Sequence, residues 1–428
     1  MQKLSKYLCL LMLSMMVLFL QKNEAHASTV YHEGDVITFT ATEEIDRLYI
    51  LWDTIPGEWI LRVDGNEYRY GKYEFLHEYV EPGISGKVWE IEILTSEVKV
   101  GSVYTYEVGE ELDDFVQIWE PPCEDADLMV FPTHADDELI FFGGTLPYYA
   151  GELDYDVQVV YLTNHWAKQP HRVHELLNGL WTCGVENYPI IGPFYDKYSK
   201  NNLEHAKTLY NLDDIRAFQV TMLRRFRPEV LIMQDVNGEY GHSVHMLNTV
   251  MMMESVELAA DENYTTADAA GYKVWDVPKM YIHFWEENRI EIMWDMKLPK
   301  FDGKTALEVA KEAYQCHASQ VSYNDIVTEP TAIGCTIFGL YRSRVGEDVL
   351  KNDFFENIVY HNEVEVPESR PSIFEEELGG EHSADTNDDI YMPPSEDDGN
   401  DHRAWWLIGV GLVCVMTGIT IIIKNKRR

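Results

Sequence analysis

The sequence predicts a three-layer, Rossmann-like α/β domain with a mainly parallel sheet at residues 123–362, preceded by an all-β sandwich at residues 28–122. Two observations predict this organisation. The first region consists of short alternating runs separated by turn signals. The second alternates continuous apolar runs of strand length with longer helical segments, as expected where strands of a parallel sheet are buried on both faces. We therefore expect two folded regions of different class.

The predicted strands of the first region are bounded by tight turns. Residues 47–52 and 88–94 alternate apolar and polar side chains, and Asp64-Gly65 and Pro82-Gly83 are turn dipeptides. The pattern is typical of a β-sandwich. It is similar to jelly-roll modules that bind carbohydrate, and it fits equally a purely structural domain that packs on the next one.

Polar clusters follow two of the predicted parallel strands. The apolar run at residues 127–131 is followed by Thr133-His134-Ala135-Asp136-Asp137-Glu138, and the run at residues 230–233 by a glycine-rich turn with Tyr240, His242 and His245. Because neighbouring parallel strands end at one edge of a sheet, we expect the clusters to converge. Carboxylates are also common in solvated turns and at helix N-caps, but the second cluster favours a metal site.

The two clusters resemble the paired signatures of the PIG-L/LmbE-like zinc de-N-acetylases. That family carries His-Pro-Asp-Asp-Glu after its first strand and Gly-His-x-x-His after a later one. Further segments are similar to family landmarks and occur in the same order: Arg172 and Glu175 with residues 179–185, Lys279-Met280-Tyr281, and His317-Ala318-Ser319-Gln320. The resemblance covers residues 124–325.

The resemblance implies a metal site. His134, Asp137 and His245 would bind the ion, and Asp136 would be the general base. Two imidazoles and one carboxylate suit Zn²⁺, which keeps a fourth position for water and lowers its pKa towards about 7. Fe²⁺ is also compatible with such a set, since geometry and availability decide the choice.

The resemblance also implies roles for three further residues. A protonated His242, together with Tyr240, would hold the oxyanion or donate a proton to the departing amine. Arg172 would bind substrate oxygens, and an ion pair with Glu175 on the same helix face is the alternative. Other histidines, His165, His171 and His174, either line a sugar pocket or are partly exposed hydrogen-bonding residues, and the second interpretation is favoured.

Two positions depart from the family pattern. Ala135 stands where proline is usual, which loosens the turn but removes no chemical group. Val244 stands where many members carry an aspartate that partners the first histidine. The carboxylate that would raise the pKa of His242 is therefore missing or comes from elsewhere, with Glu239 as the candidate.

Both ends of the chain carry apolar segments. Residues 1–27 open with Lys3 and Lys6, continue with an apolar run and reach Ala25-His26-Ala27, the features of a cleaved signal peptide. Residues 404–423 are predicted to form a transmembrane helix, followed by a cytoplasmic basic tail at 424–428. Between the catalytic domain and this helix, the acidic residues 363–403 are predicted to be a disordered stalk. These features predict a single-pass protein of the cell membrane whose catalytic domain is extracellular.

Charge and cysteine content exclude other classes. The net charge of −39 argues against a nucleic-acid partner. Cys9 and Cys414 fall in the terminal apolar segments. The other four cysteines lack the spacing of a disulfide scaffold or a zinc finger, so free thiols are expected: Cys123, Cys183, Cys316 and Cys335.

The resemblance and the termini together imply an extracellular, zinc-dependent de-N-acetylase. The expected substrate is an N-acetylated amino sugar, with N-acetylglucosamine in a surface glycan favoured. Two alternatives belong to other classes. One is a surface glycan-binding protein that has lost activity, motivated by Ala135 and Val244, and the other is an amidase that acts on a non-sugar N-acyl group.

Overall fold

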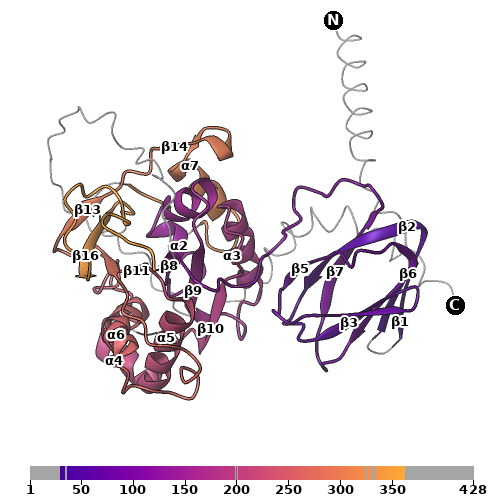
Figure 1. Ribbon diagram of the computed structural model, residues 1–428, viewed down its shortest axis with the longest axis horizontal. Coiled ribbons are helices and arrows are strands. Elements are labelled where there is room, and N and C mark those ends of the chain that lie inside the picture. The colour runs from indigo at the N-terminus through magenta and orange to yellow at the C-terminus, as the bar shows by residue number, and fades with distance from the viewer. Residues whose placement is uncertain are drawn as a thin grey trace, which may run out of the picture. The chain divides into compact units, whose positions relative to one another are not determined.

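The computed structural model describes residues 29–33, 36–197, 199, 201–322, 325–328, 331 and 334–361, shown in Figure 1. All of these residues belong to one compact unit. The predicted signal peptide (1–27), acidic stalk (363–403), transmembrane helix (404–423) and basic tail (424–428) lie outside the described residues. The boundary placed between residues 122 and 123 stays a prediction.

The predicted location, a single-pass protein of the cell membrane with its catalytic domain outside, is wrong for the part of the chain that the structure describes. There, no helix combines the length and the apolar character needed to cross a bilayer. The longest, α6 (Ser243–Ala260), has 18 residues and includes Glu254 and Glu257, whereas a span needs about 20 mainly apolar residues.

Seven strands form the β region that the alternating runs predicted. Their sheet has the order β1-β2-β6-β3-β4, and β5 and β7 also pair with β2. Residues 36–40 of β2 pair with β6 and residues 47–52 pair with β7, with a register shift between these two parts. Such a shift bends a strand and lets one long strand serve two parts of a sheet. The strands are β1 (Thr29–Glu33), β2 (Val36–Trp52), β3 (Trp59–Val63), β4 (Asn66–Tyr70), β5 (His77–Val80), β6 (Gly86–Ile93) and β7 (Val100–Glu107).

A buried carboxyl group lies among the tryptophans of this region. Trp52 and Trp59 are fully buried, and each indole Nε1 donates a hydrogen bond of 2.9 Å to Oε2 of Glu78. Buried indole N–H groups require such an acceptor. Burial raises the pKa of Glu78 to about 7, although these hydrogen bonds act to lower it.

The second large sheet confirms the mixed α/β class. Its order is β10-β9-β8-β11-β12-β16-β13. The pairs from β10 to β12 are parallel, whereas β16 is antiparallel to both β12 and β13. The strands are β8 (Leu128–Val130), β9 (Val157–Asn164), β10 (Ile190–Tyr195), β11 (Val230–Met233), β12 (Lys279–His283), β13 (Arg289–Glu291) and β16 (Ile337–Ser343), beside a separate pair, β14 (Lys297–Leu298) and β15 (Lys304–Thr305).

Helices cover both faces of this sheet (Figure 1). Leu128 and Val130 of β8 pack in one core with α2, α3 and α7. Met129 and Phe131 pack in another core with α4, α5 and α6. Successive strand residues point to opposite faces, so the continuous apolar run fills both cores. The helices are α2 (Asp137–Ile140), α3 (His171–Thr182), α4 (Leu203–Leu209), α5 (Leu212–Phe226), α6 and α7 (Ala306–Tyr314), with a π-helix η1 (Pro147–Glu152) and a 3₁₀ turn η2 (Pro299–Phe301).

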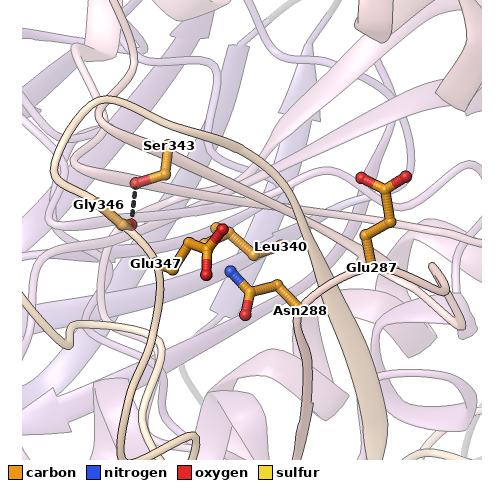
Figure 2. Close-up of a pocket in the computed structure, with 6 residues that line it drawn as sticks. All are labelled: Glu287, Asn288, Leu340, Ser343, Gly346 and Glu347. Atoms are coloured by element: carbon orange, nitrogen blue, oxygen red, sulfur yellow. Dashed lines mark hydrogen bonds between the residues drawn. The ribbon is translucent and has the colours of Figure 1, made fainter.

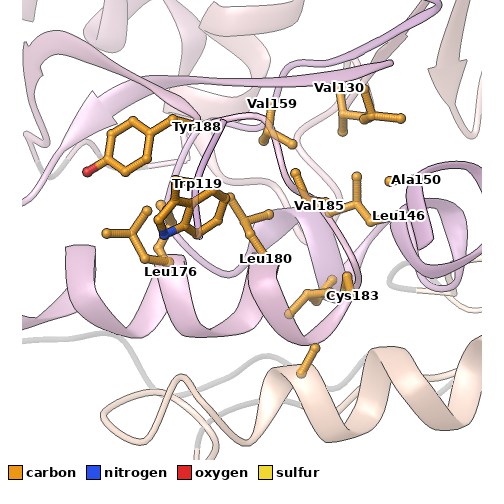
Figure 3. Packing of buried hydrophobic residues seen from close by; sticks show 14 of the residues in the cluster. Trp119, Val130, Leu146, Ala150, Val159, Leu176, Leu180, Cys183, Val185 and Tyr188 are labelled. Carbon is orange, nitrogen blue, oxygen red and sulfur yellow. The ribbon is translucent and has the colours of Figure 1, made fainter. Parts of the chain in front are cut away.

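Helix α3 is held by an aromatic cluster. Leu176 and Leu180 lie beside Trp119 and Tyr188 (Figure 3). The rings of Trp119 and Tyr188 meet edge to face, with 5.4 Å between centroids, a favoured geometry for aromatic pairs. This packing fixes the helix that carries Arg172. The four described cysteines are free thiols, as expected.

Candidate active site

The candidate site lies where parallel strands end. His134, Asp136 and Asp137 follow β8, His165 follows β9, and Asp196 follows β10. The turn after β11 supplies Tyr240, His242 and His245, the last of these on the first turn of α6. The carboxyl edge of an open α/β sheet is the usual place for a ligand site. The sequence motifs therefore converge at the predicted edge.

Three side-chain atoms form a compact triangle. Nδ1 of His134 lies 3.0 Å from Nε2 of His245. Oδ2 of Asp137 lies 3.3 Å from each of these nitrogens. Ligand atoms in a tetrahedral zinc site, with bonds of about 2.0–2.2 Å, are separated by about 3.3–3.6 Å. The triangle therefore suits one ion bound by three protein ligands.

His242 is a fourth potential ligand. His134, His242 and His245 each offer a ring nitrogen, and these nitrogens lie within 4.8 Å of one another. Oδ2 of Asp137 lies 3.3 Å from both nitrogens of the triangle, a separation that fits two ligands of one tetrahedral ion. The geometry therefore favours Asp137 as the third ligand and leaves His242 beside the ion.

Charges around the triangle favour a cation. Burial acts to lower the pKa of His245, but Asp137 and Glu239 outweigh it and raise the pKa to about 10. Burial likewise acts to lower the pKa of His134, but Asp196 and Asp137 raise it to about 9. The same carboxylates that hold protons on these rings would stabilise a metal ion bound to neutral imidazoles.

Each candidate histidine ligand has a carboxylate on its other ring nitrogen. Nδ1 of His245 lies 2.7 Å from Oε2 of Glu239, and Nε2 of His134 lies 3.1 Å from Oδ1 of Asp196. Such partners fix the tautomer and orientation of a metal-binding imidazole. Glu239 therefore supports His245, and the suggestion that it replaces the missing partner of His242 is wrong.

Asp136 lies beside the triangle in a strained backbone conformation. It is the residue before α2 and has a φ of 111°, a backbone region that residues other than glycine rarely adopt. Arg172 Nη2 lies 3.1 Å from its Oδ1 and also donates to the carbonyl of Ala135. Burial raises the pKa of Asp136 to about 6, although Arg172 acts to lower it.

Arg172 contacts the loop that carries Ala135 and Asp136. Its side chain is buried and binds Asp136 and Ala135. Arg172 was predicted to bind substrate, but the contact observed is with this loop. The alternative pairing with Glu175 is not what the structure contains. Glu175 accepts hydrogen bonds from the backbone N and the hydroxyl of Ser319, at 2.9 and 2.6 Å.

His242 and Tyr240 lie next to the triangle and are partly exposed. The ring centroid of His242 is 4.3 Å from that of His245, and Tyr240 is 6.0 Å from His245. Burial lowers the pKa of His242 well below its ordinary value, and His245 and His134 lower it further. Nδ1 of this ring has no hydrogen-bond partner among the described residues, so these surroundings favour a neutral His242 over the protonated one expected.

Sequence reasoning missed Asp196 and misjudged His165. Asp196 directly follows the apolar run that forms β10, and that position is the only sequence signal for it. His165 was expected to be partly exposed, but it is buried, and its Nε2 has no hydrogen-bond partner among the described residues. Its ring lies 5.9 Å from that of His134.

A separate hollow lies beside β13 and β16, and it contains none of the predicted site residues. Figure 2 shows Glu287, Asn288 and Glu347 around it. The hydroxyl of Ser343 donates to the carbonyl of Gly346 there. This hollow offers no histidine or cysteine, so it does not compete with the triangle as a catalytic site.

Known proteins resemble the second region of the chain. Residues 128–256 match the family described as PIG-L: GlcNAc-PI de-N-acetylase. A 1D-myo-inositol 2-acetamido-2-deoxy-alpha-D-glucopyranoside deacetylase from Catenulispora acidiphila is 32% identical over 178 residues, 36% of this chain and 54% of the relative. One from Geodermatophilus obscurus is 27% identical over 182 residues, 36% of this chain and 60% of the relative. The chain thus spans little more than half the length of these relatives.

Solved structures align more distantly. The conserved protein TT1542 from Thermus thermophilus has a TM-score of 0.35 and 18% identity, covering 46% of this chain and 80% of that one. N,N'-diacetylchitobiose deacetylase from Pyrococcus horikoshii has a TM-score of 0.33 and 18% identity, covering 46% and 72%.

Proposed function

From the PIG-L family domain at residues 128–256, we propose that the chain is a metal-dependent deacetylase. It hydrolyses the acetamide of an N-acetylated amino sugar, with N-acetylglucosamine as the first candidate. The observation that carries the proposal is the triangle of His134, Asp137 and His245, with the carboxylate of Asp136 beside it. The relatives named as deacetylases of a 2-acetamido sugar support the choice of substrate class.

Zn²⁺ is the proposed ion, with His134, Asp137 and His245 as its ligands. When bound, it supplies a Lewis acid that polarises the acetamide carbonyl and lowers the pKa of a water molecule. Glu239 and Asp196 hold the two imidazoles with the ligating nitrogens directed at the site.

Asp136 is the proposed general base. Arg172 holds its Oδ1, which orients the carboxylate so that it takes a proton from the water that attacks the acetamide carbon. A pKa of about 6 leaves Asp136 mostly ionised at neutral pH. It also lies close to the operating pH, where a general base is most effective.

Tyr240 and His242 are proposed to stabilise the transition state. Negative charge develops on the acetamide oxygen as its carbon becomes tetrahedral, and the phenol of Tyr240 and one N–H of a neutral His242 can donate to it. A neutral His242 does not supply the proton that the departing amine needs. Asp136 transfers to the amine nitrogen the proton that it took from water, and acetate and a free amino sugar are released.

The alternative of an inactive glycan-binding protein rested on Ala135 and Val244. Ala135 contributes only its carbonyl, which Arg172 binds, and Val244 is buried in the core. Neither substitution removes one of the three donor atoms or the base, so turnover remains the better-supported reading.

Acetate release from N-acetylglucosamine and its oligomers tests the proposal. The full chain is assayed with and without added Zn²⁺, and His245→Ala is the control. Release that requires the ion and is lost in the control supports the proposal. Bound zinc without release from any amino sugar, but with release from a simple N-acyl amide, would replace it with a non-sugar amidase.

A further inference from the structure

A second cleft lies where β2 and β7 meet α3, and it contains none of the residues of the candidate active site. Its volume is about 460 Å³, within the range of about 300–1,000 Å³ that is usual for ligand pockets. It combines aromatic and polar side chains, namely Tyr49, Asp53, Ser102, Phe115, His174 and Asn178.

Buried groups behind the cleft orient His174. Trp119 Nε1 donates to Oε1 of Gln117 at 3.0 Å, so this oxygen is an acceptor and His77 Nδ1, 2.7 Å away, donates to it. Burial lowers the pKa of His77 to about 3, so the ring is neutral and its Nε2 accepts from His174 Nδ1 at 2.9 Å. The remaining nitrogen of a neutral His174, Nε2, is therefore an acceptor.

The same glutamine orients Asn178. Gln117 Nε2 donates to Oδ1 of Asn178 at 2.7 Å, so the Asn178 NH₂ group is left as a donor. His174 and Asn178 are four residues apart on α3, and they therefore lie on one helix face. Asp53 adds a carboxylate acceptor, and the Ser102 hydroxyl can donate or accept. The cleft thus presents fixed acceptors and a fixed donor side by side.

Phe115 adds an aromatic surface to the cleft. Its ring packs on Tyr104, with 4.9 Å between centroids, and on Tyr49 at 6.0 Å, yet 45% of the residue is exposed. A supported ring with an accessible part is suited to stacking on a flat apolar face. A pyranose offers such a face together with neighbouring hydroxyls that both donate and accept. The carboxylate of Asp53 disfavours a phosphorylated or acidic sugar.

We propose that this cleft binds an uncharged pyranose unit of an oligosaccharide, as a site additional to the candidate active site. The choice of N-acetylglucosamine as that unit rests on the proposed function. The cleft then holds one part of a glycan chain while the site at His134 acts on another part or on another chain.

Calorimetric titration with the β-1,4-linked tetramer of N-acetylglucosamine tests this proposal. The full chain carries Asp136→Asn in all samples, so that the ligand is not consumed. Phe115→Ala is expected to raise the Kd roughly five- to tenfold through the loss of stacking. Ile118→Ala is the matched control, because Ile118 is exposed to 44% against 45% for Phe115 and does not line the cleft. Equal Kd values for the two variants would overturn the proposal.

Asn178→Asp provides a second test that does not depend on removing bulk. Aspartate keeps the acceptor for Gln117 but replaces the donor with an acceptor, so we expect binding of the tetramer to weaken about tenfold. Unchanged binding would contradict the assigned donor. Acetate release from the monosaccharide by the unmodified chain is measured separately. If the tetramer binds in a Phe115-dependent way but no acetate is released, the cleft proposal stands and the proposed function fails. If acetate is released but binding does not depend on Phe115, the proposed function stands and the cleft proposal fails.

Discussion

Each candidate histidine ligand is held by a carboxylate outside the ligand triangle. Glu239 is fully engaged: Oε2 lies 2.7 Å from His245 Nδ1, and Oε1 accepts from the backbone N of Asp235 at 2.7 Å. Its own φ is 55°, which is uncommon outside glycine. The turn after β11 is thus organised around this one side chain.

Glu239→Gln is expected to weaken Zn²⁺ binding by about 10- to 100-fold. Glutamine retains an oxygen for one of the two hydrogen bonds, but it has no negative charge to hold the His245 ring. Competition with a chromophoric chelator measures the affinity directly, without reference to turnover. Glu262→Gln, at an exposed position, is the control, and equal affinities in the two variants would exclude a supporting role for Glu239.

Asp136→Asn is expected to keep the metal and to lower kcat by about 10²- to 10⁴-fold. The amide can still accept from Arg172, but it cannot take a proton from water. Metal content by atomic absorption and initial rates of acetate release are the two measurements. Near-normal turnover with bound zinc would show that another group is the base.

The sequence could predict that the proposed ligands and the proposed base lie close together, because they fall in two short motifs that follow neighbouring strands. It could not place the supporting groups. Asp196 is about sixty positions from His134 in the chain, and only the parallel pairing of β9 and β10 brings its strand to the site. For Arg172, the sequence could not show that Asp136 would occupy its guanidinium, because that contact depends on how α3 packs.

Among single elements, β5 carries the clearest pH-sensitive group. Glu78 has a pKa of about 7 in the folded chain against 4.5 for the ordinary residue. The folded state therefore binds more protons than the unfolded state between these values. The stabilising contribution is fully present below pH 4.5 and is lost as the pH rises through about 7.

Wild-type protein should therefore lose roughly 3 kcal/mol of stability from this group as the pH rises across that window. Glu78→Gln keeps one oxygen as the acceptor for the two indoles and loses the acceptor for the backbone N of Gly71. Because the amide does not ionise, the stability of this variant should change less with pH. Denaturant unfolding at pH 5 and pH 8 measures the difference. Glu81→Gln, at an exposed position, should lose stability with pH as the wild type does. If Glu78→Gln loses as much stability as the wild type, Glu78 is not the group responsible.

The elements with continuous apolar runs were the most predictable. The runs at 127–131 and 230–233 correspond to β8 (Leu128–Val130) and β11 (Val230–Met233). The antiparallel strands β13 and β16 on the edge of the sheet were not anticipated, since strand direction depends on connections and not on local pattern. The β region was predicted from alternation, but the sharing of β2 between two sets of partners depends on a register shift that no residue type marks.

For the molecule as a whole, bound metal should be a major source of stability. The site brings Asp137, Asp196 and Glu239 close to two imidazoles, and an ion that binds only the folded state stabilises it by about 3–4 kcal/mol at 100- to 1,000-fold excess over Kd. Thermal unfolding with Zn²⁺ and with a chelator should differ by several degrees. His245→Ala should abolish the difference, and an equal shift in that variant would place the stabilising ion elsewhere.

The backbone of Asp136 has a φ of 111°, a conformation that costs folding free energy at the position of the proposed base. A residue in so sparsely populated a conformation costs about 1–3 kcal/mol, and glycine would adopt it freely. Asp136→Gly should relieve this strain, but it also leaves the buried guanidinium of Arg172 without its carboxylate, which costs about 3–5 kcal/mol. The variant should therefore unfold at lower denaturant than the natural chain and release no acetate. The strained backbone at this position is thus held in place by the ion pair that its own side chain makes with Arg172.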